Sequence, residues 1–306
     1  MKIAVVVDAA CDMPRKFIQH YGIEILPLKI DIDDEIFFDH RDPDETQYFY
    51  LNYLAQKDTG AMVRALDIKE TIDFFFANLV TKYDRVLILT LSAQRAQVFE
   101  NVTKASFAIV KKQRHLRNAA GLSGSFAIRV VDTKTMMAGQ AILAHEALRL
   151  IREEELPFDR LRPNLENLSR SVKTYLIPKN LQFLRRKNGT LPPIGLFGYA
   201  AGQSFDVKPI LRLRNGGVRV IKKAMGYDKA IETVFDQAIR DIEFGLRTPV
   251  VAMSYAGEPR EMSEREGYQR FYEFSHDYGV EILLSVMSAA AGANLGPGAF
   301  SIAYAV

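Results

Sequence analysis

Short apolar runs alternate with segments of helical spacing along the first half of the chain. Runs rich in strand-forming residues at 2–7, 85–91 and 126–131 predict strands, and the continuous apolar run at 85–91 is typical of a strand buried on both faces of a parallel sheet. The strand and helix signals alternate, which predicts a parallel sheet covered by helices, with further extended segments beside it. The predicted helices are 15–21, 44–56, 68–82, 96–112 and 136–153, and the extended segments are 23–30 and 36–38.

The pattern breaks after Glu155, where Pro157 and Pro163 interrupt the helical spacing. Beyond this point strands and helices follow in a less regular order. The predicted strands are 171–176, 205–212, 218–221, 249–254, 280–285 and a last one after a Gly/Pro-rich loop; the predicted helices are 181–186, 228–245 and 264–278. We therefore expect an α/β protein of two α/β domains: residues 1–156 with a parallel sheet flanked by helices, and residues 157–306 with a mixed sheet and helices.

Composition narrows the class of protein but leaves its function open. Of the 306 residues, 48% are hydrophobic and 25% charged, as in an ordinary globular protein. No apolar run reaches the roughly 18 residues of a membrane-spanning helix, so no membrane insertion is expected. The first apolar run meets Asp8 too early for a signal peptide, which favours a cytoplasmic protein. A net charge of +3 is too small to indicate a nucleic-acid partner.

Three residues with reactive side chains follow the first predicted strand, at the edge where open α/β sheets bind ligands: Asp8, Cys11 and Asp12. A phosphatase of the haloacid-dehalogenase type would need a second Asp where Ala10 stands. Cys11 has no nearby histidine that could act as its base, so a buried structural thiol is favoured. As the single cysteine, it also excludes an internal disulfide and a cysteine-based zinc site. The sequence therefore gives no catalytic residue and no metal ligand.

A basic cluster ends one predicted helix: Lys111, Lys112, Arg114 and Arg117. Cations are favoured at helix C-termini by the helix dipole, and no aromatic residues are interleaved as in RNA-binding surfaces. Solvated surface charge is therefore the favoured interpretation.

Several segments, in order, resemble the DegV family of bacterial proteins. VVVDAACDMP at residues 5–14 is similar to the family's opening strand and turn, "DSTADLP". VLILTLSA at 86–93 and VVDTKTMMAGQ at 130–140 are similar to two later strand ends. VKPIL at 207–211 and GANLGPG at 292–298 resemble segments of the family's second domain. The resemblance spans nearly the whole chain, so we expect the family's two-domain fold.

The resemblance implies a non-catalytic binding protein. A member of this family buries a long-chain fatty acid in a tunnel between its two domains, and hydroxyls and a histidine hold the carboxylate. In some bacteria the protein presents the fatty acid to a separate kinase. The resemblance thus implies a fatty acid or related acyl lipid as ligand, a fatty acid kinase as a partner, and no cofactor.

The positions that match the family's head-group site carry different residues here. Met62-Val63-Arg64-Ala65 stands where the family has Thr-Ser-Gln-Pro, and Ser92-Ala93 replaces a pair of serines. Asn294 replaces the histidine before the Gly-Pro-Gly loop and would donate without titrating. The guanidinium of Arg64 could form a bidentate ion pair with a carboxylate and so replace the hydroxyl donors that the family has at this site. The candidate ligand-binding residues are Met62, Arg64, Ser92, Ala93, Asn294, Gly296 and Gly298.

Two other functions stay open at this point. The chain could carry or sense a different amphiphile, because the expected head-group residues are altered. It could also be an enzyme that acts on an acyl or phosphorylated small molecule. The sequence shows no set of residues suited to acid–base catalysis, which counts against this alternative.

Overall fold

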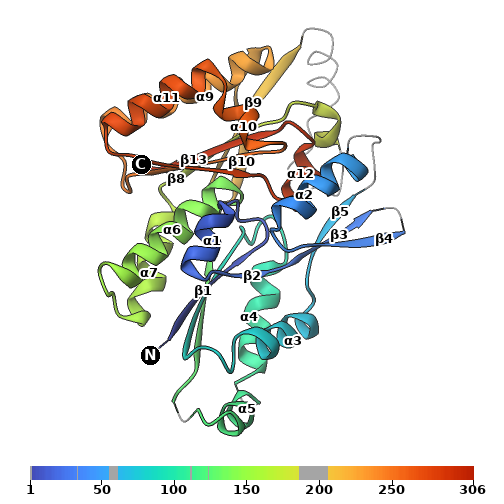
Figure 1. The fold of residues 1–306 in the computed structure, drawn as a ribbon, viewed down its shortest axis with the longest axis vertical. Helices are drawn as coiled ribbons and strands as arrows, with labels where there is room; N and C mark the ends of the chain where they lie inside the picture. Colours follow the sequence, from blue (N-terminus) through green and yellow to red (C-terminus); the bar gives the residue numbers. More distant parts are fainter. Residues whose placement is uncertain (1, 33, 55–60, 111, 123, 186–205) are drawn as a thin grey trace.

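The computed structural model describes residues 2–32, 34–54, 61–110, 112–122, 124–185 and 206–306 (Figure 1). These residues form three sheets with helices packed around them. The mixed α/β architecture confirms the predicted fold class. Among the described residues, no helix is both long and apolar enough to cross a membrane.

The first sheet is parallel and has the strand order β2-β1-β6-β7. Its strands are β1 (Ile3–Asp8), β2 (Glu24–Leu26), β6 (Arg85–Thr90) and β7 (Ala127–Asp132). The apolar runs of β1 and β6 are buried on both faces, as their sequences predict. The helices of this part are α1 (Arg15–Tyr21), α3 (Ile68–Asn78), α4 (Val98–Ala108), α5 (Gln113–Ala119) and α6 (Ala138–Arg152).

A small antiparallel sheet of order β4-β3-β5 lies beside the first sheet. It consists of β3 (Leu28–Ile32), β4 (Glu35–Asp39) and β5 (Met62–Ala65). The predicted segment 23–30 is split at Pro27, because proline cannot donate to a ladder, and its two parts join different sheets. The predicted helix 44–56 corresponds to α2 (Pro43–Phe49) and the π-helical turn η1 (Tyr50–Leu54).

The second large sheet is mixed, with the order β10-β9-β8-β13-β11-β12. Only β11 and β12 pair in parallel among its described strands. The strands are β8 (Val172–Ile177), β9 (Val207–Arg214), β10 (Gly217–Met225), β11 (Val250–Tyr255), β12 (Glu281–Val286) and β13 (Phe300–Ala305). The helical segments are α7 (Phe158–Ser169), η2 (Leu181–Arg185), α9 (Tyr227–Phe244), α10 (Pro259–Ser263), α11 (Glu266–Asp277) and α12 (Ala289–Leu295).

Two segments differ from their predictions. Pro163 does not interrupt structure but lies inside α7, whose Leu161, Leu165 and Leu168 are buried; packing of this apolar face outweighs the missing N–H. The glycine-rich segment near the C-terminus is not all loop, because α12 covers its first part. Ser288 caps α12 by accepting a hydrogen bond from the N–H of Ala291 at 3.1 Å.

The two halves of the chain pack closely together. One apolar cluster contains residues of the first sheet together with Leu176, Leu211 and Leu213 of the second large sheet. Helix α7, just after the predicted boundary, packs on α6 and β7 of the first sheet. The division at residue 156 stays a prediction.

The basic cluster is not uniformly a surface feature. Arg117 is buried, and its guanidinium donates to the carbonyl of Val80 at 2.8 Å and to the Asp84 carboxylate at 2.9 Å. Lys112 and Arg114 are exposed, as expected, and Lys111 lies outside the described residues. The interpretation as solvated charge is therefore wrong for Arg117, because this side chain satisfies carbonyls at a turn.

Candidate functional site

A narrow apolar pocket lies between the carboxyl edge of the first sheet, the small sheet and α12. Its cavity volume is only about 20 Å³, little more than one water molecule needs. Ten of the lining residues are apolar and two are polar. They are Ala10, Leu28, Val63, Arg64, Ala65, Leu91, Ala96, Met136, Met137, Ala290, Ala291 and Asn294. Such a pocket suits a slender apolar ligand with one polar end.

Arg64 and Asn294, both predicted from the sequence, are the two polar residues of this pocket. Arg64 lies on β5 and is half exposed; its guanidinium contacts the Asp31 carboxylate through Nε and through Nη2, the latter at 2.6 Å. Asn294 lies on α12 and is buried, with its side-chain nitrogen donating to the carbonyl of Ala290 at 2.8 Å. The structure thus brings two of the candidate residues to the same pocket, one from β5 and one from α12.

The other candidates lie outside the pocket lining. Ser92 follows the carboxyl end of β6 and is buried, but its Oγ lies beside Gly216 and its neighbour Leu91 faces the pocket. Ala93 is exposed, and its N–H donates to the Asp132 carboxylate at 3.1 Å. Met62 is on the outward side of β5.

Gly296 and Gly298 shape the turn after α12. Both have a positive φ, of 84° and 74°, which favours glycine. A Cβ on Gly296 would overlap the Phe183 ring, and one on Gly298 would lie 2.5 Å from Lys179 Cδ. Both glycines therefore serve close packing around the turn.

Asp8 holds two pocket-lining residues in place. Its buried carboxylate accepts hydrogen bonds from the N–H groups of Leu91 at 2.5 Å and Ala10 at 3.0 Å. Burial raises the pKa of Asp8 to about 7, although these two hydrogen bonds lower it. Next to it, Cys11 is also buried, and burial raises the pKa of its thiol, as the structural interpretation of this cysteine predicts.

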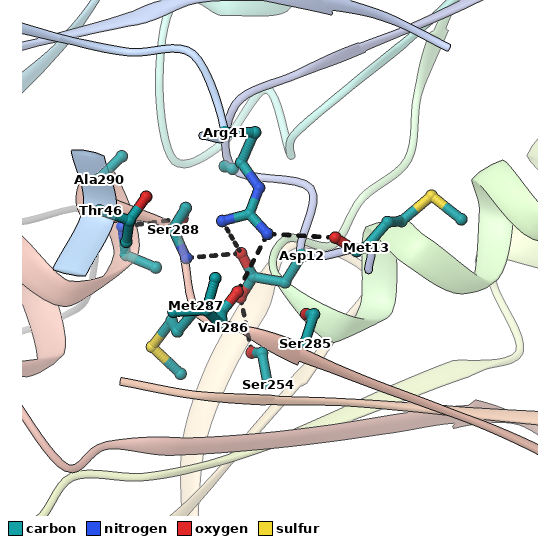
Figure 2. A network of polar contacts seen from close by, with 12 residues as sticks. Asp12, Met13, Arg41, Thr46, Ser254, Ser285, Val286, Met287, Ser288 and Ala290 are labelled. Carbon is teal, nitrogen blue, oxygen red and sulfur yellow. Dashed lines mark hydrogen bonds and ion pairs between the residues drawn. The ribbon is translucent and has the colours of Figure 1, made fainter. Parts of the chain in front are cut away.

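A buried polar network joins the loop after β1 to the loop before α12 (Figure 2). Asp12 accepts from the N–H of Ser288 at 2.9 Å and from the hydroxyl of Ser254 at 2.6 Å. Arg41 lies 3.6 Å from Asp12 and donates to the carbonyl of Val286 at 3.0 Å. Asp39 accepts from the N–H of Ala290 at 2.9 Å.

A family model described as an uncharacterised protein of the DegV family matches residues 2–306. The chain belongs to the DegV family. A DegV domain-containing protein of Xanthomonas axonopodis pv. citri is 38% identical to it over 307 residues, which cover 100% of this chain and 98% of the relative.

Two solved DegV-type structures share this fold at low sequence identity. One is a DegV lipid binding protein from Thermotoga maritima, with a TM-score of 0.78, 20% identity, and coverage of 100% of this chain and 99% of that chain. The other is the Fatty Acid Kinase B3 protein of Streptococcus pneumoniae loaded with linoleic acid, with a TM-score of 0.75, 13% identity and full coverage of both chains. The DegV fold expected from the sequence resemblance is confirmed, and the division into two domains stays a prediction.

Sequence reasoning missed two residues of this DegV chain that stand next to the pocket. Asp39 and Arg41 are buried, although charged residues in a polar stretch ordinarily face solvent. The structure shows that the backbone of Arg41 has a φ of 62°, which non-glycine residues rarely adopt, but the sequence does not reveal this. The sequence places Asp8 and Asp12 at a strand end but gives no sign that both accept hydrogen bonds from backbone N–H groups.

Proposed function

We propose that this DegV protein binds a long-chain fatty acid or related acyl lipid, with the chain in the apolar pocket. The observation that carries the proposal is the composition of the pocket: ten apolar residues and, among the described residues, only Arg64 and Asn294 to meet a polar head. Burying about 15 methylenes contributes about 12 kcal/mol before the costs of immobilisation. A carboxylate cannot be buried without donors, and Arg64 and Asn294 are the donors that we propose for it.

The solved relatives support this ligand class. They include a DegV family protein from Thermus thermophilus that binds fatty acid and a stearic acid-binding protein from Eubacterium ventriosum. The Streptococcus pneumoniae relative is named as part of a fatty acid kinase. We therefore propose a carrier, not a catalyst, that presents its ligand to a separate kinase. Because such a kinase uses ATP, the proposed encounter is cytoplasmic.

The domain organisation expected from the sequence fits the proposal. Nine pocket residues come from residues 10–137, and three come from α12 in the second half. We propose that the ligand tunnel lies between the domains 1–156 and 157–306, with α12 as the wall that the second domain contributes. The pocket is narrow, so this wall has to shift when a chain enters.

The ligand class is tested directly by organic extraction of the purified protein, followed by mass spectrometry. A bound fatty acid supports the proposal. A different amphiphile would favour the alternative carrier role, and a protein that neither retains nor takes up added fatty acid would contradict the proposal.

Arg64 gives a residue-level test. Replacing Arg64 with Gln is expected to weaken fatty acid binding about tenfold or more, because a hydrogen-bonded charge at the carboxylate is lost. Asp31→Asn is expected to tighten binding, since Asp31 now competes for the same guanidinium. Titration calorimetry measures both effects. Arg129→Gln is the matched control, because Arg129 also forms an exposed ion pair, with Asp159 at 2.7 Å, away from the pocket. Equal affinities of wild type and Arg64→Gln would remove Arg64 from the head-group site.

A further inference from the structure

Helix α12 is a short pocket wall whose first turn is anchored by the other half of the chain. It contributes Ala290, Ala291 and Asn294 to the pocket lining. The N–H of Ser288, which caps the helix, donates to Asp12, and the N–H of Ala290 donates to Asp39, each at 2.9 Å. A seven-residue helix is not stable by itself, so its position depends on such contacts.

Arg41 completes the anchor from the same side. It lies 3.6 Å from Asp12 and donates to the carbonyl of Val286, which precedes α12. Its own backbone N–H donates to Asp39 at 2.9 Å. Figure 2 shows the Arg41 guanidinium in contact with both the Asp12 carboxylate and the backbone at Val286. We call Asp12, Asp39 and Arg41 the clamp.

The clamp is buried, and some of the hydrogen-bond donors of its arginine have no acceptor. Asp12, Asp39 and Arg41 are 0%, 1% and 5% exposed. Within the described part of the chain, Nε and Nη1 of Arg41 have no hydrogen-bond partner, and Nη1 contributes only the longer contact to Asp12. Four of the seven residues of α12 are alanine, and all seven are buried. The hydroxyl of Tyr50 also donates to the carbonyls of Met287 and Ser288, at 2.9 and 3.0 Å, so the clamp and Tyr50 together supply the polar contacts that anchor the start of α12.

We propose that Asp12, Asp39 and Arg41 are positioning residues that hold α12 against the pocket and so control how quickly an acyl chain enters and leaves. The inference rests on the proposed function for its ligand. Its physical basis is the narrowness of the pocket. An acyl chain can enter only when a wall of the pocket moves. Helix α12 is the wall that the polar contacts of the clamp hold in place. Loosening the clamp raises the population in which the wall has moved.

The test uses Asp39→Asn in the full chain. Asparagine keeps the size of the side chain but has one acceptor oxygen, so it cannot serve the N–H groups of Arg41 and Ala290 as the carboxylate does. Stopped-flow mixing with the fluorescent fatty acid cis-parinaric acid is expected to show association at least about tenfold faster, the change that corresponds to one lost charge-assisted hydrogen bond. Dissociation is expected to accelerate as well, because the same wall must move when the chain leaves. Mere destabilisation of the fold would not accelerate association.

Asp132→Asn is the matched control. Asp132 also accepts backbone N–H groups at the end of a strand, from Ala93 at 3.1 Å and Lys134 at 2.9 Å, but neither residue lines the pocket. Its rate constants are expected to stay within about twofold of wild type. Both donors use one oxygen, which asparagine retains.

Amide hydrogen exchange separates this inference from the proposed function, because it needs no ligand. Exchange at residues 289–295 is expected to be at least about tenfold faster in Asp39→Asn than in wild type, and unchanged in Asp132→Asn. Unchanged exchange in Asp39→Asn overturns the clamp even if fatty acid binds. Faster exchange with an unchanged or slower association rate also overturns it. Failure of the wild type to bind the probe contradicts the proposed function alone.

Discussion

Replacing Arg41 with methionine is expected to lower the free energy of unfolding by about 3–5 kcal/mol at pH 8. The guanidinium lies 3.6 Å from the buried Asp12 carboxylate and lowers the pKa of both Asp12 and Asp39, so its removal leaves these two buried carboxylates without their main compensating charge. Methionine fills a similar volume without a charge, so the loss reports electrostatics more than packing. Urea unfolding measures the change. Arg129→Met is the control, because its exposed ion pair contributes about 1 kcal/mol or less.

The loss of unfolding free energy in Arg41→Met is expected to be smaller at acidic pH. Burial raises the pKa of Asp12 and Asp39 above the ordinary value, and Arg41 lowers both. Without Arg41 the native-state pKa values rise further, while those of the unfolded chain stay near 4. A group with a raised native pKa loses its stabilising contribution as the pH climbs from the unfolded value through the native one. The difference from wild type should therefore be smaller at pH 5 than at pH 8. An equal or larger deficit at pH 5 would contradict this account.

Asp8 is expected to make the native state progressively less stable between about pH 4 and pH 7. Its native pKa is raised to about 7 by burial, so the folded chain keeps a proton that the unfolded chain has released. Over that interval the free energy of unfolding falls by about 1.4 kcal/mol per pH unit from this group, or about 4 kcal/mol in total. Above pH 7 both states are ionised and the contribution is constant.

Asp8→Asn isolates this effect because asparagine does not titrate. The variant loses one of the two carboxylate acceptors that serve Leu91 and Ala10, which costs about 1–3 kcal/mol relative to the ionised wild type. Relative to the variant, the wild type should therefore be most favoured near pH 4 and lose that advantage as the pH rises to 7. Urea unfolding at several pH values gives the two curves. Parallel curves would show that Asp8 does not titrate in this range.

The elements that the sequence predicted well are those whose pattern is local. Strand β6 is a continuous apolar run because it is covered on both faces, and α9 has the apolar spacing of a helix packed on a sheet. Strand β5 and helix α12 lack such patterns. β5 is extended because it pairs with β3, with Val63 opposite Ile30, and α12 is held at its first turn by groups from far along the chain.

The candidate site was predictable only in part, for a related reason. Arg64 and Asn294 were found through their positions in family motifs, and they do line the pocket. Asp39 and Arg41 could not be distinguished from surface charges, because what buries them is more than two hundred positions away at Val286 and Ala290. A charged residue shows its buried role in the sequence only when its partner is nearby.

The position of β13 has a consequence for synthesis on the ribosome. This strand ends at Ala305, yet it lies inside the second large sheet, between β8 and β11. At translation rates of about 5–20 residues per second, β8 and β11 emerge well before the strand that joins them. Until β13 arrives, both expose unpaired backbone edges to the cellular surroundings. A nascent chain of this protein can therefore pair the strands of its first sheet early, whereas β8 and β11 can be joined only after β13 has been synthesised.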